Sequence, residues 1–196
     1  MTTAPTAAAI IAGGQATRFG GRDKSRLSIN GQSIISRQVA VLQPLTDDLF
    51  LVASQHERFA DLPWRVYPDL LPGTGVLGAI LTALEATAAD RVLTVACDLP
   101  FLHPGVMARL LELAQTADGA WISTPAGAEP LIACYRRHTA PHIRRQIALG
   151  RLKVTDLARA LTFKAIDLPE LETFGDPSRL LANVNSPEDL STIVSS

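Results

Sequence analysis

The sequence is poor in cysteine, has no excess of either charge and has no long hydrophobic run. It holds two cysteines, Cys97 and Cys134, with no CxxC pair and no zinc-ligand spacing around them, which argues against a disulfide framework or a zinc site. Eighteen basic residues face 19 acidic ones, so a net charge of −1 gives no general attraction for nucleic acid or an anionic membrane. Any anionic ligand must therefore be held by a local arrangement of groups.

Signals for export or membrane insertion are also missing. No apolar run approaches the ~20 residues that span a bilayer. Residues 1–12 are rich in Ala and Thr but lack the basic start of a signal peptide. Both cysteines lie in apolar runs, which is typical of buried thiols in a reducing compartment. These features predict a cytoplasmic protein that contacts neither membrane nor nucleic acid.

The chain does have many apolar residues, which occur in runs and periods typical of strands and helices. With 196 residues, 47% of them hydrophobic, it can bury a sizeable core, and no repeat or linker divides it, so one domain over 1–196 is expected. Apolar runs typical of buried strands cover residues 7–12, 49–53, 65–67 and 91–96. Helical periodicity covers residues 34–42, 78–86 and 104–114. Strands that alternate with helices predict an α/β fold of three layers, with a mainly parallel sheet and helices on both faces.

The second half is less regular. It predicts paired strands over 120–123 and 131–135, a strand over 163–168 and a last helix that begins near Ser186. A helix over 140–149 is expected between them, with Thr139 as its cap, Pro141 in its first turn and Gly150 as its stop.

A glycine-rich loop follows the first predicted strand, where parallel sheets bind ligands. It reads Ala12-Gly13-Gly14-Gln15-Ala16-Thr17-Arg18-Phe19-Gly20-Gly21-Arg22-Asp23-Lys24. Glycines let backbone N–H groups converge on phosphate oxygens, and Arg18 and Lys24 add positive charge. A Walker loop is excluded because Asp23 precedes Lys24, and the glycine spacing does not fit a dinucleotide fingerprint. The alternative is an exposed connection with no ligand.

This loop resembles the signature of the molybdenum cofactor guanylyltransferase (molybdopterin-guanine dinucleotide biosynthesis protein A) family. The carrying pattern is Ile11-Ala12-Gly13-Gly14-x-x-x-Arg18-Phe19-Gly20-Gly21-x-Asp23-Lys24. The resemblance implies a Rossmann-like nucleotidyltransferase fold of the glycosyltransferase-A type. It favours guanine over cytosine, because the related cytidylyltransferases usually lack the second Gly-Gly-x-Asp.

The resemblance also implies roles for these positions. Backbone amides of residues 11–14 would contact the base and the phosphates, and Lys24 would bind the phosphates of GTP. The implied GTP-binding residues are therefore Ile11, Ala12, Gly13, Gly14 and Lys24. Arg18 and Lys24 would be catalytic, since they would neutralise charge on the transferring phosphate.

An aspartate follows the predicted strand over 91–96. Asp98 stands in Ala96-Cys97-Asp98-Leu99-Pro100. A carboxylate at the end of a central parallel strand suits Mg²⁺, which binds through few carboxylates and the substrate's phosphates. A helix or turn cap is the local alternative. The family carries its metal on a similar Asp-x-Pro, so the resemblance implies that Asp98 is a metal ligand, a GTP-binding residue and a catalytic residue.

A second aspartate, Asp69, precedes a loop rich in Gly and Pro. Local sequence alone favours a turn residue here, whereas the resemblance implies a GTP-binding role. Two positions depart from the family pattern. Val76 stands where the family usually has Pro, and Val52 aligns with an asparagine that contacts the nucleotide, for which Ser54 or Gln55 is a candidate substitute.

The C-terminal segment carries a third match, Asn183-Val184-Asn185-Ser186-Pro187-Glu188. The two asparagines favour a turn before a capped helix, while the resemblance implies that Asn183 and Asn185 line the acceptor side of the cleft. Arg151 and Lys153 lie nearest the family's basic segment. The resemblance makes them candidates for contact with the phosphate of the acceptor substrate, a molybdenum-pterin cofactor. Other basic residues nearby are expected to be solvated.

The resemblance implies transfer of GMP from GTP to the molybdenum-pterin (Mo-molybdopterin) cofactor with Mg²⁺, which yields the guanine dinucleotide cofactor and pyrophosphate. Transient contact with the proteins that deliver and receive the cofactor is a further expectation. Two rivals stay open: a cytidylyl- or sugar-phosphate nucleotidyltransferase, and a non-catalytic nucleotide-binding module.

Overall fold

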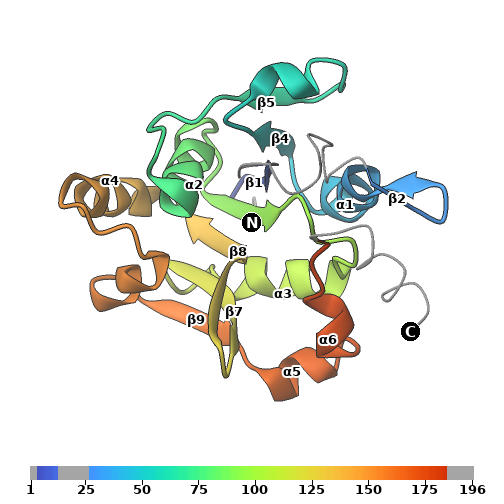
Figure 1. Ribbon diagram of the computed structural model, residues 1–196. Coiled ribbons are helices and arrows are strands. Elements are labelled where there is room, and N and C mark those ends of the chain that lie inside the picture. The colour runs from blue at the N-terminus through green and yellow to red at the C-terminus, as the bar shows by residue number, and fades with distance from the viewer. Residues whose placement is uncertain (1–3, 13–26, 185–196) are drawn as a thin grey trace.

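A central sheet organises the computed structural model, which describes residues 4–12 and 27–184 (Figure 1). Its order is β5-β4-β1-β6-β8-β7-β9, and β2 and β3 form a separate two-stranded sheet. The strands are β1 (Thr6–Ile11), β2 (Ser28–Ile29), β3 (Gln32–Ser33), β4 (Asp48–Val52), β5 (Arg65–Tyr67), β6 (Arg91–Ala96), β7 (Gly119–Thr124), β8 (Gly127–Arg136) and β9 (Phe163–Ile166). The expected α/β fold with a mainly parallel sheet is therefore confirmed.

The first half of the chain builds the parallel part. β1 pairs in parallel with β4 on one side and with β6 on the other, and β5 extends the sheet beyond β4. Every residue of β1 is buried, which explains its uninterrupted run of Ala and Ile. Because these four strands run the same way, the loops that follow them leave from one edge of the sheet.

The second half adds the antiparallel strand β8, which pairs with β6 and, across the short turn at residues 125–126, with β7. β9 then pairs in parallel with β7 and closes that edge. The strand predicted over residues 163–168 is shorter, because Asp167 accepts a hydrogen bond from the Glu170 N–H and caps helix α5.

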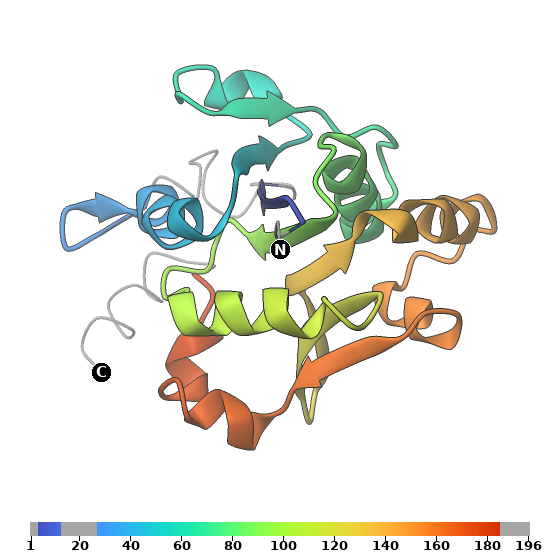
Figure 2. The same cartoon turned by 180° about the vertical axis from the view of Figure 1, so that it is seen from behind.

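Helices cover both faces of the sheet. They are α1 (Ile34–Leu42), α2 (Gly75–Glu85), α3 (Pro104–Leu113), α4 (Ala140–Ala148), α5 (Leu168–Glu172) and α6 (Pro177–Leu180). Short 3-10 helices are Gln43–Leu45, His56–Phe59, Arg137–Thr139 and Val154–Arg159. In both views α2 and α4 lie on one side of the sheet and α1 and α3 on the other (Figures 1 and 2).

Alternate residues of β1 serve these two layers. Ala8 and Ile10 pack with the residues of α1 and α3, whereas Ala7, Ala9 and Ile11 pack with those of α2 and α4. Two cores thus meet at the sheet, and the period of two within a wholly apolar run is visible only in the folded chain.

Local helix signals were partly right. Gly150 ends α4 with a positive φ of 70°, as predicted. Thr139 does not cap α4: its own backbone is helical and its hydroxyl donates to the Arg136 carbonyl at 2.7 Å. The β2–β3 turn, Asn30-Gly31, has positive φ at both residues, as tight Asn-Gly hairpin turns require.

Candidate functional site

The carboxyl edge of the parallel strands is joined into one surface by the backbone. Hydrogen bonds run from Cys97 N–H to Ile11 C=O (3.1 Å), from Ala12 N–H to Val52 C=O (2.8 Å) and from Ala53 N–H to Tyr67 C=O (3.0 Å). Each bond lies just past a strand end, so the loops after β1, β4, β5 and β6 begin side by side. The segments predicted to bind nucleotide and metal therefore leave from one edge.

β1 presents its end to this edge through the backbone. The Ile11 side chain is 4% exposed and packs in the α2–α4 core, so only its main chain can reach a ligand. Ala12 is half-buried. The rest of the predicted phosphate loop, Gly13, Gly14, Arg18 and Lys24, lies outside the described residues, and those roles stay predictions.

Asp98 is half-buried and directly follows the end of β6. Its carbonyl oxygen accepts a hydrogen bond from the Val184 N–H at 2.9 Å. Val184 is fully buried in a small cluster with Ile29 and Ile34. Its neighbour Asn183 is exposed. The structure therefore brings two predicted site residues together, a metal ligand and an acceptor contact that are 85 positions apart in the sequence. Asn185, the other asparagine of that motif, lies outside the described residues.

Asp69 begins a second loop at the same edge. Burial raises the pKa of its half-buried carboxyl group, and the described residues offer that carboxylate no hydrogen bond or ion pair. The next residue is anchored, because the Leu70 N–H donates to the buried Thr82 hydroxyl at 3.1 Å. Gly73 and Gly75 then turn the chain into α2 with φ of 85° and 64°. A desolvated carboxylate without a partner is suited to accept hydrogen bonds from a ligand.

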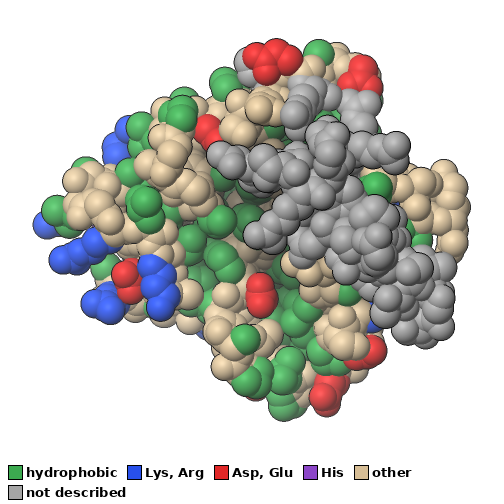
Figure 3. Space-filling model, in the orientation of Figure 1, with side chains coloured by type: hydrophobic (Ala, Val, Ile, Leu, Met, Phe, Trp, Pro, Cys, Tyr) green, Lys and Arg blue, Asp and Glu red, His purple; other side chains and the backbone are tan. Residues whose placement is uncertain are grey.

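Arg151 and Lys153 are exposed and follow the end of α4. Lys153 lines a cavity of about 380 Å³ together with Val76, Leu152 and other residues of the loop before α2 and the 152–155 segment. The predicted acceptor cation thus lies beside the loop that starts at Asp69. Figure 3 shows Lys and Arg side chains gathered on this side of the molecule, next to a hollow with a largely hydrophobic floor.

The two departures from the family pattern have different surroundings. Val52 is fully buried, so its side chain reaches no ligand, whereas Ser54 and Gln55 are exposed just beyond the strand. Val76 is 38% exposed in the first turn of α2. The candidate substitutes for the missing asparagine are therefore accessible, and their role stays a prediction.

A metal would find few protein ligands at this edge. Within residues 4–12 and 27–184 no group of three or more His, Cys, Asp or Glu could hold a metal ion. Mg²⁺ needs no such cage, because it is usually bound through one or two carboxylates together with substrate phosphates and water. A single carboxylate, Asp98, beside a predicted triphosphate site fits that requirement.

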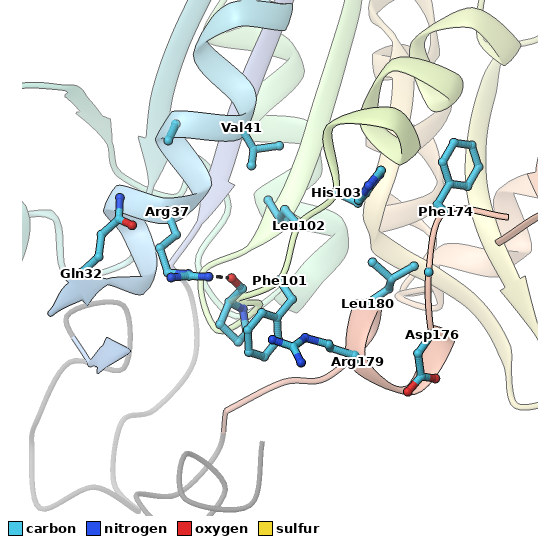
Figure 4. Close-up of a pocket in the computed structure, with 13 residues that line it drawn as sticks. Gln32, Arg37, Val41, Phe101, Leu102, His103, Phe174, Asp176, Arg179 and Leu180 are labelled. Carbon is cyan, nitrogen blue, oxygen red and sulfur yellow. Dashed lines mark hydrogen bonds between the residues drawn. The ribbon is translucent and has the colours of Figure 1, made fainter. Parts of the chain in front are cut away.

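A separate cavity lies behind the Asp98 loop. It has a volume of about 420 Å³ and is lined by α1, residues 100–103 and the α6 region (Figure 4). The guanidinium groups of Arg37 and Arg179 lie 5.7 and 4.6 Å from the centre of the Phe101 ring. Arg37 also donates from Nε to the Pro100 carbonyl at 3.2 Å. These contacts fix the outer side of the loop.

Neither Cys97 nor Cys134 takes part in a disulfide. Burial raises the pKa of the Cys134 thiol to about 12, so it stays protonated, while Cys97 is only partly buried rather than fully so as expected. Among the helices of the described chain, none has the length and apolar character needed to cross a bilayer.

Known proteins resemble this chain over most of its length. The model of the family described as "MobA-like NTP transferase domain" matches residues 8–164. A probable molybdenum cofactor guanylyltransferase of Chloroflexus aggregans is 35% identical over 192 residues, 94% of this chain and 91% of the relative. One of Carboxydothermus hydrogenoformans is 34% identical, over 92% and 91%.

The fold also resembles that of a solved structure. The crystal structure of molybdopterin-guanine dinucleotide biosynthesis protein A from Archaeoglobus fulgidus superposes with a TM-score of 0.80, covering 96% of this chain and 97% of that one. Its sequence identity is 22%, so this likeness concerns the fold.

Proposed function

The chain belongs to the family of MobA-like NTP transferase domains, and on that premise we propose that it transfers GMP from GTP to the molybdenum-pterin cofactor. The relatives named as molybdenum cofactor guanylyltransferases span nearly its whole length, which supports this activity. We further propose that residues 1–196 act as one nucleotidyltransferase domain and that the protein works in the cytoplasm.

The observation that carries the proposal is the joined carboxyl edge. The bond between Cys97 N–H and Ile11 C=O holds the segment before Asp98 against the end of β1, where the predicted phosphate loop begins. A triphosphate bound by that loop would therefore lie next to the Asp98 carboxylate. This geometry supports Asp98 as the residue that would hold Mg²⁺, and Mg²⁺ would supply neutralisation of charge on the phosphates.

The reaction needs positioning more than acid–base chemistry. A terminal phosphate oxygen of the pterin cofactor attacks the α-phosphorus of GTP, the new P–O bond forms, and the bond to the β-phosphate breaks as pyrophosphate leaves with its electron pair. The attacking oxygen is already an anion, so no strong base is required. Lys24, Arg18 and loop amides would stabilise the developing charge.

The remaining residues divide between donor and acceptor. Asp69 would bind the guanine nucleotide, since its carboxylate has no partner among the described residues and can accept hydrogen bonds from N–H or O–H donors. Asn183, beside Asp98, and Asn185 would face the pterin, with Arg151 and Lys153 near its phosphate. Contacts with proteins that deliver or receive the cofactor belong to the same proposal.

Pyrophosphate release with purified pterin cofactor tests this function. GTP, CTP and ATP are compared with Mg²⁺ and with excess chelator. We expect product from GTP with Mg²⁺ only. A preference for CTP would contradict the guanylyl assignment, and tight GTP binding without product would contradict an enzymatic role.

A further inference from the structure

The buried amide of Gln38 connects α1 to the loop that carries Asp98. Gln38 is 1% exposed, and its Nε2 donates to the Ala96 carbonyl at 2.7 Å and to the Leu99 carbonyl at 2.9 Å. These carbonyls stand on either side of the Cys97-Asp98 pair. Both protons of one side-chain amide therefore hold the two ends of the turn that presents the carboxylate.

The chemistry of the partners fixes the orientation of this amide. Both partners are acceptors, so only the NH₂ group can face them, and a flipped amide would put oxygen against oxygen. Gln38 Oε1 is buried and has no hydrogen-bond partner among the described residues. A buried acceptor without a donor is unfavourable. The two donated hydrogen bonds must therefore offset that penalty in the folded chain.

Other distant elements hold the same loop. The Arg37 guanidinium donates to the Pro100 carbonyl at 3.2 Å, drawn as the dashed line in Figure 4. The Val184 N–H donates to the Asp98 carbonyl at 2.9 Å. Gln38 differs from both, because one buried side chain holds backbone groups on both sides of Asp98.

We propose that Gln38 is a positioning residue that fixes the Asp98 turn and so sets the affinity of the protein–GTP complex for a divalent cation. The inference rests on the proposed function, in which Asp98 holds that cation. Residues that orient a metal ligand typically change metal affinity by about 10–100-fold when they are replaced. The two hydrogen bonds from Gln38 would act in the same way, by fixing the backbone on both sides of Asp98.

Two substitutions of Gln38 in the full chain test whether its hydrogen bonds to Ala96 and Leu99 matter for cation binding. Gln38→Met keeps the length of the side chain without its donors, and Gln38→Glu keeps the shape but turns acceptors toward two carbonyl oxygens. Mn²⁺ serves as the probe and is titrated by EPR into the protein–GTP complex without acceptor. We expect Kd for Mn²⁺ to rise about tenfold or more in both variants. Amide hydrogen exchange at Cys97 and Val184, whose N–H groups bond within the same region, is expected to accelerate.

Arg91→Met is the matched control. Arg91 is 6% exposed at the other end of β6 and likewise donates to two backbone carbonyls, those of Leu111 and Ala4. This variant should lose stability comparably but keep the wild-type Kd for Mn²⁺ and the wild-type exchange at Cys97 and Val184.

Asp98→Ala separates the two levels of the proposal. Loss of Mn²⁺ binding in Asp98→Ala with unchanged binding in both Gln38 variants overturns the positioning role and leaves the proposed function intact, even if amide exchange changes. Wild-type Mn²⁺ affinity in Asp98→Ala overturns the metal role and the inference with it. Weaker binding in all three variants, but not in Arg91→Met, supports both.

Discussion

The two loops that carry the candidate aspartates are built differently. The Asp98 turn is held from outside: α1 donates to its carbonyls through Gln38, and the backbone of Val184 donates to Asp98 itself. The Asp69 loop is held mainly by its own neighbourhood, through the Thr82 hydroxyl of the following helix. One loop is fixed by the tertiary core and the other by local contacts.

This difference matches the tasks proposed for the two loops. Charge neutralisation at a transferring phosphate needs a ligand held in one position, whereas a nucleotide-binding loop must first admit its ligand. The Asp69 carboxylate is also kept in an unfavourable state before the ligand binds, because burial raises its pKa and no described residue compensates. In the proposed function, Asp98 would therefore act from a position fixed by distant contacts, whereas Asp69 would gain its hydrogen bonds from the bound ligand.

Removing the Asp98 carboxylate gives the largest expected effect. Asp98→Ala should lower kcat by at least about a hundredfold, since metal charge stabilisation is worth several kcal/mol and about 1.4 kcal/mol is a factor of ten. Pyrophosphate release measures it. Asp90→Ala, at the opposite end of β6, loses an ion pair with Arg136 and should retain activity. A variant of Asp98 with near-normal kcat would remove the distinction between the two loops.

Asp69→Asn probes the binding side of the comparison. It should raise KM for GTP about tenfold, equal to about 1.4 kcal/mol, with a smaller effect on kcat. A decrease confined to kcat, with KM for GTP unchanged, would show that Asp69 acts in the chemical step instead.

Although Asp69→Asn should weaken GTP binding, it should stabilise the folded protein at neutral pH. The pKa of Asp69 is raised in the folded state, so the folded protein binds the proton more tightly than the unfolded chain. It loses stability as pH rises from the ordinary Asp value near ~4 through the higher pKa of the folded state. Asp69→Asn avoids that loss. Its thermal midpoint should exceed the wild-type value at pH 7 and equal it below pH ~3. Equal midpoints at both pH values would contradict the cause assigned to the pKa shift.

Thr82→Val tests whether the Asp69 loop depends on the hydrogen bond from Leu70 to α2. The variant keeps the shape of the side chain but leaves the Leu70 N–H without its acceptor, at about 1–2 kcal/mol of stability. KM for GTP should rise as the loop loosens. Thr139→Val is the control, because Thr139 is also buried and hydrogen-bonded but lies beside α4. It should lose stability with no change in KM.

The smallest effect is expected at Gly73. Its φ of 85° disfavours a side chain, although no atom of the described residues lies within 4 Å of an added Cβ. Gly73→Ala should therefore destabilise by about 1 kcal/mol through the backbone. Gly73→Asn should lose less, because Asn adopts positive φ more readily. Denaturant unfolding measures both. Equal midpoints for Gly73→Ala and wild type would mean that the loop changes conformation freely.

Several features of this protein follow from its sequence alone. Apolar runs and helical periods give the alternating strands and helices of residues 34–114, because each pattern reports a local hydrogen-bonding geometry and the burial of one face. The likeness of the first loop and of the Asp98 motif to one family led to the activity that the relatives support. The missed hairpin at Asn30-Gly31 and the cap at Asp167 were also readable locally.

Only the tertiary structure decided which of these segments meet. The order of the strands, the antiparallel placement of β8 and the bond from Val184 to Asp98 depend on how finished elements pack. Gln38 reaches carbonyls 58 and 61 positions away, and a glutamine in an amphipathic helix carries no mark of that contact. Hydrophobic periodicity shows which face of a single helix or strand is buried. A contact between distant residues forms only when packing offsets the entropy lost by closing the chain between them.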